Sequence, residues 1–96
     1  MEIKKVMTPG IKRTIPLELQ MFLWSLHSAK TERDYLTVFN FKKKDGYLIV
    51  KHSQQEPEYS EEYKFKIDIE VPETVFIIDD FVDEFKLSTI LLASEY

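Results

Sequence analysis

The chain contains no cysteine and only two glycines among its 96 residues. Without cysteine it has no disulfide framework, no thiolate zinc site and no cysteine nucleophile. The two glycines, Gly10 and Gly46, both fall in predicted turns, so no glycine-rich loop remains to hold a phosphate group. The Gly-x-Ser-x-Gly elbow of many hydrolases is absent as well. The common sequence signatures of nucleotide-binding proteins and hydrolases are therefore excluded.

Long apolar runs are also missing from the sequence. No stretch reaches the length of a membrane span, and the first ten residues lack the apolar core of an export signal. We therefore expect a cytoplasmic protein that does not bind a membrane. Hydrophobic residues make up 44% of the chain and aromatic residues 14%, which is enough to build a core. The length suits a single domain over residues 1–96.

The stretch "IPLELQMFLWSLH" predicts a helix that begins near Ile15 and ends at about Ala29. Pro16 suits the first helical position, because its missing N–H removes no internal hydrogen bond. Glu18 in the first turn complements the positive end of the helix dipole. This is the main helix that we expect in the fold.

The residues before this helix have a weaker pattern. Residues 2–7, "EIKKVM", are predicted as a short strand. Pro9 and Gly10 suit the two central positions of a type II turn. A second short strand is then predicted from Ile11 to Thr14.

The strongest local signal is a hairpin turn at Asp45 and Gly46. It separates two runs rich in β-branched and aromatic residues, "DYLTVFNF" and "YLIVKHS". If Lys44 pairs with Tyr47, the register of the two strands is fixed, and one face of the hairpin becomes apolar. The residues predicted on this core face are Phe39, Phe41, Leu48 and Val50.

The second half of the chain is predicted to be mostly strand. Apolar and polar residues alternate through "EEYKFKIDIEV", residues 61–71, as in a half-solvated strand. "TVFIID" predicts a more buried strand, and "LSTILLA" predicts a final strand or a short helix, of which we favour the strand. The predicted fold class is α+β, with one main helix packed on an antiparallel sheet of about four to six strands in two layers.

The predicted helix carries apolar residues on two sides. One stripe should face the sheet and contains Leu19, Phe22, Leu23 and Leu26. The nearly opposite stripe contains Leu17, Met21, Trp24 and Ser28. Either a terminal segment of the chain covers this second stripe, or the stripe is a surface for a protein partner or a second copy, since exposed apolar patches mark interfaces.

Charge is divided unequally along the chain. Residues 1–51 hold ten basic and five acidic residues, a balance of +5, whereas residues 52–96 hold three and twelve, a balance of −9. If the two halves interleave in the sheet, these charges only solvate it. Alternatively, the acidic residues form a surface that docks a basic protein patch. The members of that surface are Glu56, Glu58, Glu61, Glu62, Asp79, Asp80, Asp83 and Glu84.

The charged residues suggest two further kinds of site. Lys42, Lys43 and Lys44 at the hairpin tip could contact phosphate, but a pI near 5.2 and the lack of a nucleic-acid motif argue against this function. Asp79 and Asp80 follow an apolar strand and are weak candidates for binding Mg²⁺ or Ca²⁺. Their spacing matches no calcium loop.

The two histidines are interpreted as structural residues. His27 lies near the end of the predicted helix, where a protonated imidazole is favoured by the helix dipole. His52 is predicted opposite Phe39, at the edge of the core face. We assign no catalytic residue and predict no cofactor.

Five stretches together resemble a known family: "IPLELQMFLWSLH", "DYLTVF", "PEYSEEY", "FIIDD" and "STILLASEY". They are similar to a family of small uncharacterised proteins from low-GC Gram-positive bacteria and their prophages, known only as a domain of unknown function. The resemblance implies a free-standing bacterial cytosolic protein. It implies no activity and no site residue.

The sequence therefore favours a non-enzymatic protein-protein interaction or accessory module that binds a protein partner or forms a homo-oligomer. Its predicted interaction residues are the apolar anchors Leu17, Met21 and Trp24 and the acidic rim residues Glu61 and Glu62. One alternative is a small metal-dependent enzyme that uses the Asp79 and Asp80 loop. A second alternative is a nucleic-acid-associated regulator.

Overall fold

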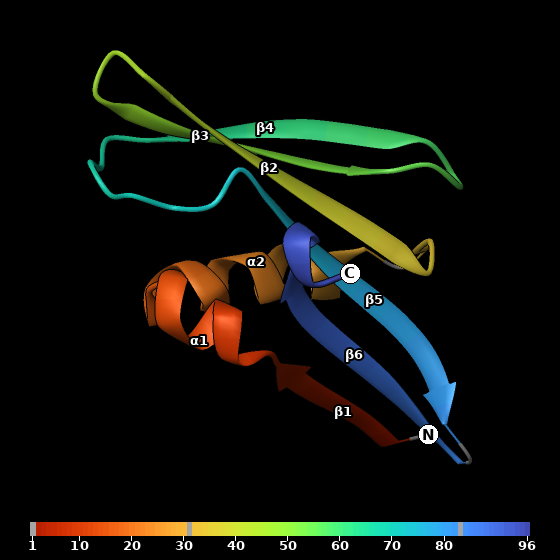
Figure 1. Ribbon diagram of the computed structural model, residues 1–96. Helices are drawn as coiled ribbons and strands as arrows, with labels where there is room; N and C mark the ends of the chain where they lie inside the picture. The colour runs from red at the N-terminus through yellow and green to blue at the C-terminus, as the bar shows by residue number, and fades with distance from the viewer. Residues whose placement is uncertain (1, 31, 83) are drawn as a thin grey trace.

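The computed structural model describes residues 2–30, 32–82 and 84–96. These residues form six strands, two α-helices and a C-terminal 3₁₀ turn (Figure 1). The elements in chain order are β1 (Glu2–Met7), α1 (Pro9–Thr14), α2 (Leu17–Ala29), β2 (Leu36–Lys44), β3 (Tyr47–Gln54), β4 (Tyr59–Phe65), β5 (Thr74–Val82), β6 (Phe85–Leu92) and η1 (Ala93–Glu95).

All six strands belong to one sheet with the order β1-β6-β5-β2-β3-β4. The fold class is α+β, as predicted. The prediction of a purely antiparallel sheet is wrong, because β1 pairs with β6 in parallel while the other neighbours are antiparallel. The first and last strands of the chain meet at this pair, and no local sequence pattern specifies such a long-range pairing.

The predicted hairpin and its register are confirmed. Asp45 and Gly46 have φ angles of 53° and 79°, which is the left-handed backbone that a two-residue hairpin turn of this kind requires. Lys44 pairs with Tyr47, and the pairs Phe41 with Val50 and Phe39 with His52 follow from it. The strand predicted over "LSTILLA" is also confirmed, because β6 covers most of it.

The prediction of a turn and a strand between residues 9 and 14 is wrong. These residues form the helix α1, so the fold has a second helix besides the main one. Thr8 is the N-cap, and its side-chain oxygen accepts a hydrogen bond from the N–H of Ile11. Pro9 occupies the first helical position, where its missing N–H costs no internal bond. The pair Thr8-Pro9 is thus a helix start rather than the beginning of a turn.

The main helix α2 ends at Ala29 as predicted, but it begins at Leu17 because Pro16 is its N-cap. Its sheet-facing stripe is confirmed, since Leu23 is fully buried and the other three residues of the stripe pack against the core. The core itself lies between α2 and the sheet and contains Ile11, Ile15, Leu23, Phe39, Phe41, Leu48, Val50, Val75, Ile77 and Ile90.

The strand predicted over residues 61–71 is only half correct. β4 ends at Phe65, and residues 66–72 have no regular secondary structure. Ile69 and Val71 still pack against the core, and the ammonium group of Lys43 lies 3.0 Å from Asp68 and 2.9 Å from Glu70. The alternation of apolar and polar residues arises because one side of this segment packs on the core. Such packing does not require hydrogen bonds to a neighbouring strand.

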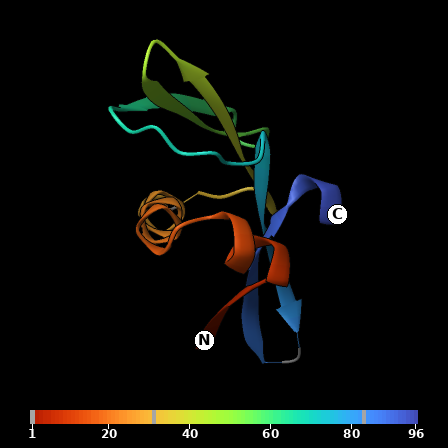
Figure 2. The same ribbon diagram turned by 60° about the vertical axis from the view of Figure 1, so that its left-hand side comes forward.

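The two sides of the sheet have different surroundings. Figure 2 shows α2 on one side of the strongly twisted sheet and the C-terminal turn on the opposite side. We call the opposite side the open face. Because side chains alternate along a strand, the residues next to the core residues point to this open face. In the described residues, no helix is long and apolar enough to cross a membrane.

Candidate functional site

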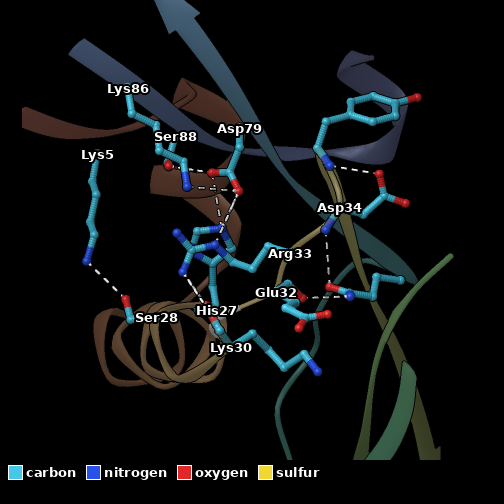
Figure 3. A network of polar contacts seen from close by, with 12 residues as sticks. Lys5, His27, Ser28, Lys30, Glu32, Arg33, Asp34, Asp79, Lys86 and Ser88 are labelled. Carbon is cyan, nitrogen blue, oxygen red and sulfur yellow. Dashed lines mark hydrogen bonds and ion pairs between the residues drawn. The ribbon is translucent and has the colours of Figure 1, made fainter. Parts of the chain in front are cut away.

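Among the described residues, the carboxylate of Asp79 has the most polar contacts, and it lies on the helix-facing side of β5 (Figure 3). Nε2 of His27 lies 3.1 and 2.9 Å from its two oxygens, and the hydroxyl of Ser88 lies 2.5 Å from Oδ1. The side-chain nitrogens Nε of Arg33 and Nζ of Lys86 each lie 3.6 Å from Oδ2. We call these five residues the Asp79 cluster.

The Asp79 cluster joins three parts of the chain that are distant in sequence. His27 comes from the last turn of α2, Asp79 and Ser88 pair across β5 and β6, and Arg33 comes from the loop before β2. Nη1 of Arg33 also donates hydrogen bonds to the carbonyl oxygens of His27 and Lys30 at the end of α2. The carbonyl of His27 also accepts the N–H of Lys30 at 3.4 Å, and Arg33 adds a side-chain donor to both carbonyls, which stabilises the helix end.

The carboxyl group of Asp79 is ionised in this environment. Burial acts to raise its pKa, but the hydrogen bonds from His27 and Ser88 and the charge of Lys86 outweigh burial and lower the pKa below its usual value. An ionised carboxylate can only accept hydrogen bonds, so Nε2 of His27 carries a proton. Nδ1 of His27 is buried and has no hydrogen-bond partner among the described residues.

Ser88, His27 and Asp79 are residue types of a nucleophilic triad, but their arrangement is different. In a triad the serine hydroxyl is hydrogen-bonded to the imidazole, which in turn is oriented by the carboxylate. Here both Ser88 and His27 donate to the same carboxylate, and Ser88 is completely buried. This geometry fixes α2 to β5 and β6, and it does not activate Ser88.

A second histidine, His52, is buried on the helix-facing side of β3 and stacks on Phe39 with a centroid distance of 4.9 Å. The ring of Tyr59 packs edge-on against it at 5.1 Å. Neither ring nitrogen has a hydrogen-bond partner among the described residues. Burial lowers the pKa of His52 to about 4, with the nearby His27 and Lys30 acting in the same direction and Glu61 in the opposite one. His52 is therefore an uncharged core residue at neutral pH.

The predicted anchors of α2 are placed differently from one another. Leu17 and Met21 are each 63% exposed, whereas Trp24 is partly buried and packs against the core. From β1, Nζ of Lys5 donates to the hydroxyl of Ser28 at 3.3 Å and lies 5.4 Å from the centre of the Trp24 ring. The N-terminal strand thus reaches the C-terminal part of the second stripe and leaves its beginning exposed.

A shallow hollow of about 450 Å³ lies beside the exposed part of this stripe. Leu17 and Met7 line it, and Met7 is 46% exposed. Lys12 and Arg13 of α1 border the same hollow. We call the three apolar residues Met7, Leu17 and Met21 the helix patch.

The two predicted rim residues do not form one surface. β4 is the edge strand on the side of the sheet opposite to β1, and Glu61 and Glu62 point to opposite faces of β4. Glu61 accepts hydrogen bonds from the hydroxyl groups of Tyr59 and Tyr63. Glu56 and Glu58 lie in the turn before β4, whereas Asp80 and Glu84 lie at the β5-β6 hairpin. Asp83 lies outside the described residues.

Asp79 and Asp80 do not converge on one position. Asp79 points into the cluster beneath α2, and Asp80 points from the next position of β5 to the open face. Among the described residues there is no group of three or more histidine or acidic side chains placed to hold a metal ion. The metal-dependent alternative stays a prediction, and the placement of these carboxylates gives it no support.

The lysines at the β2-β3 hairpin are likewise separated. Lys43 points to the helix-facing side and interacts with Asp68 and Glu70, whose hydrogen bonds raise its pKa. Lys42 and Lys44 point to the open face. The three lysines do not form one continuous basic surface.

An apolar groove of about 380 Å³ lies on the other side of α2. Leu19 and Phe22 form one wall, Phe65 and Ile67 form the other, and Leu48 lies between them. The ring of Phe22 contacts Phe65 edge-on at 4.9 Å. The irregular segment after β4 therefore forms part of this groove.

Sequence reasoning missed the Asp79 cluster and the apolar character of the open face. The cluster involves residues up to 61 positions apart, from His27 to Ser88, so no spacing rule identifies it. The open face was detectable in principle, because "TVFIID" and "STILL" are apolar at consecutive positions instead of alternating. Consecutive apolar residues in a strand indicate that both of its faces meet apolar surroundings.

Comparisons with known proteins agree with the resemblance seen in the sequence. Comparison with curated proteins gives no match. A crystal structure described as that of the protein of unknown function from Enterococcus faecalis has the same fold, with a TM-score of 0.79 and 19% sequence identity over 97% of this chain and 90% of that one. Residues 4–95 match the family described as "Staphylococcal protein of unknown function (DUF960)", and the chain therefore belongs to this family.

Proposed function

We propose that this protein is a cytosolic, non-enzymatic accessory module that binds an acidic, amphipathic segment of a protein partner through the helix patch. The observation that carries this proposal is the exposure of Leu17 and Met21. They lie one helical turn apart on α2, and each leaves 63% of its surface in solvent. Solvent-exposed apolar residues that adjoin one another are typical of protein interfaces.

Charge around the helix patch supports an acidic partner. Lys12 and Arg13 border the hollow, and Lys5 of β1 lies beside Trp24, farther from the start of α2. Glu18 is the acidic residue of the first turn of α2. A partner segment with one or two large apolar side chains flanked by carboxylates would fill the hollow and pair with these cations.

The chemistry of the interior also favours a binding function. The cluster that most resembles a catalytic site holds its serine completely buried and its carboxylate already hydrogen-bonded. A binding module needs no reactive group, and its main requirement is a rigid surface. The Asp79 cluster supports such rigidity, because it anchors the end of α2 whose beginning carries the helix patch.

Trp24 provides the measurement for this proposal. It is the only tryptophan of the chain, and it lies on the same stripe as Leu17 and Met21. A synthetic amphipathic peptide with leucine anchors and flanking glutamates should change the emission of Trp24. The same peptide with lysines in place of the glutamates should bind with an affinity at least about tenfold lower.

Variants test the surface itself. Leu17→Glu with Met21→Glu should weaken binding of the acidic peptide by about 2 kcal/mol or more, as loss of interface anchors does. Tyr35→Glu is the matched control, because Tyr35 is a large side chain that is 59% exposed elsewhere on the molecule. Cellular proteins that become cross-linked to the wild type should not be cross-linked to the double variant, and they should still be cross-linked to the control. Equal retention by both variants would contradict the proposal.

A further inference from the structure

The open face carries an apolar patch that no helix of the described residues covers. It crosses four neighbouring strands, β1, β6, β5 and β2. The ring of Tyr96, which follows η1, packs edge-on against Phe76 within this patch, with 5.6 Å between the ring centroids. We call this set the open-face patch. It consists of Val6, Leu36, Val38, Phe76, Ile78, Leu87 and Leu91. Val6 is 43% exposed, Leu91 is buried, and the other five are half-buried.

Strand pairing makes the open-face patch continuous. Leu36 pairs with Ile78, Val38 pairs with Phe76, and Phe76 pairs with Leu91, so these side chains are direct neighbours across the sheet. In a two-layer α+β fold, the side of the sheet away from the helices normally alternates to polar residues. A contiguous apolar surface in its place is typical of a protein interface.

Opposite charges predominate at the two ends of this face, and Lys4 of β1, whose ammonium group lies over the ring of Phe85, is a cation at the acidic end. Asp80 lies beyond Ile78 at one end, and the exposed Glu84 lies in the adjacent hairpin. Lys42 and Lys44 lie at the other end, because β2 continues past the Asn40 and Thr74 pair to the hairpin tip. Within the described part of the chain, none of the four charged groups Asp80, Glu84, Lys42 and Lys44 takes part in an ion pair.

We propose that the open-face patch binds a second copy of this chain, with the two sheets packed face to face around a two-fold axis that runs across the strands. Such an axis reverses the strand direction of the second copy. It therefore places the acidic end of each sheet over the basic end of the other. Asp80 of β5 and Lys42 of β2 come from adjacent strands, so the reversal brings them close without a lateral shift.

A dimer of this kind needs only a modest share of the molecular surface. A stable interface buries about 800 Å² on each partner. The molecule exposes 6372 Å² in total, so such an interface covers about one eighth of it. Closed two-fold symmetry is the commonest form of a homo-oligomer. In this arrangement it covers the patch and pairs both charged ends at the same time.

This dimer is independent of the proposed function, because the open face and the helix patch lie on opposite sides of the sheet. The helix patch remains accessible in it. A failure of peptide binding at Leu17 and Met21 therefore leaves the dimer untouched, and loss of the dimer leaves peptide binding untouched.

Sedimentation velocity tests the proposal. The wild type should sediment as a dimer at about 100 μM, and it should dissociate on dilution. Ile78→Lys places a charge in the open-face patch and should produce monomers at the same concentration. Met21→Lys adds the same charge on α2 and should remain dimeric. Far-UV circular dichroism establishes whether each variant is folded.

Charge reversal provides a second test with exposed residues that do not support the fold. Lys42→Glu with Lys44→Glu should weaken the dimer by about tenfold, and Asp80→Lys with Glu84→Lys should do the same. All four changes together exchange the two ends and should restore the dimer to within about threefold of the wild type.

Three outcomes would overturn the proposal. The first is a wild type that stays monomeric at about 100 μM. The second is a dimer that is lost with Met21→Lys and kept with Ile78→Lys, because this places the interface on α2. The third is a fourfold charge variant that dimerises more weakly than either double variant, because this excludes the reversed arrangement of the two sheets.

Discussion

Asp79 and Asp80 are consecutive residues of β5, yet they lie in opposite environments. The side chain of Asp79 is 7% exposed and receives hydrogen bonds from His27 and Ser88 beneath α2. Asp80 is exposed on the open face. Because the side chains of a strand alternate between its faces, a step of one residue crosses from a sealed polar cluster to solvent.

The same contrast extends over the whole sheet. The buried polar side chains of the strands all belong to the helix-facing side, and they are Thr37, His52, Gln54 and Ser88. The open face buries one residue among those described, the apolar Leu91. Specific polar contacts therefore hold α2 in a single position, whereas the open face offers apolar area across β1, β6, β5 and β2.

The largest change in stability that tests this contrast is expected when each aspartate is replaced by asparagine. Asp79→Asn should lower the free energy of unfolding by about 4 kcal/mol, because it leaves the charges of Arg33 and Lys86 without a partner in a mostly buried place. Asp80→Asn should change it by less than about 0.5 kcal/mol. Urea denaturation of the two variants measures the difference. Equal losses would contradict the assignment of the two faces.

The pH dependence of stability tests the buried side through His52. Its pKa is 6.5 in the unfolded chain and about 4 in the fold, so between these values the unfolded state binds more protons. Stability therefore falls as the pH drops from 6.5 to 4, by about 3 kcal/mol in total. Asp79 adds a further loss at lower pH, because its pKa is lowered and its contribution disappears as it becomes protonated.

His52→Phe separates these two effects. Phenylalanine keeps the aromatic stack on Phe39 and removes the titrating group. Stability of this variant should be nearly constant between pH 6.5 and 4 and should still fall below that range. Thermal unfolding at several pH values measures it. An unchanged slope between pH 6.5 and 4 would exclude His52 as its source.

The β2-β3 turn sets the register that decides which side chains point to each face. A substitution in this turn should have a smaller effect on stability. Gly46 has a φ of 79°, where a side chain is strained, and no other atom lies within 4 Å of the position that a Cβ would take. Gly46→Ala should therefore cost about 1 kcal/mol through backbone strain alone. The β2-β3 register should stay unchanged, which amide nuclear Overhauser effects across the two strands would verify.

The smallest effect is expected at the exposed part of α2. Met21→Gln keeps the helix propensity and removes an apolar group that is already mostly in solvent, so stability should change by less than about 0.5 kcal/mol. Leu23→Ala on the buried side of the same helix should cost about 3 kcal/mol. Similar losses at both positions would mean that another part of the protein covers Met21.

Local patterns predicted those parts of the fold that short-range chemistry decides. Asp45 and Gly46 supplied the backbone for a two-residue turn, and the register of β2 and β3 followed from it. The apolar period of 3.6 residues located α2 and the stripe that packs on the sheet. The helix α1 was missed, although Thr8 and Pro9 carry its N-cap signal, because Pro9 and Gly10 also fit a turn.

Long-range contacts could not be predicted in the same way. The parallel pairing of β1 with β6 depends on the sum of the other strand pairings, and nothing near either strand encodes it. The exposure of the candidate anchors could not be predicted from the sequence either. The sequence placed Leu17, Met21 and Trp24 on one stripe, but only the position of β1 separates the exposed Leu17 and Met21 from the partly buried Trp24.

The sequence by itself determined the periodicity of each element, the hairpin and its register, and the presence of more apolar surface than one helix can cover. These depend on backbone sterics and side-chain spacing within a few residues. Only the tertiary structure decided which apolar residues remain exposed and which polar residues meet at Asp79. Both outcomes depend on the order of the strands, because burial and the pairing of charges are properties of neighbours in space.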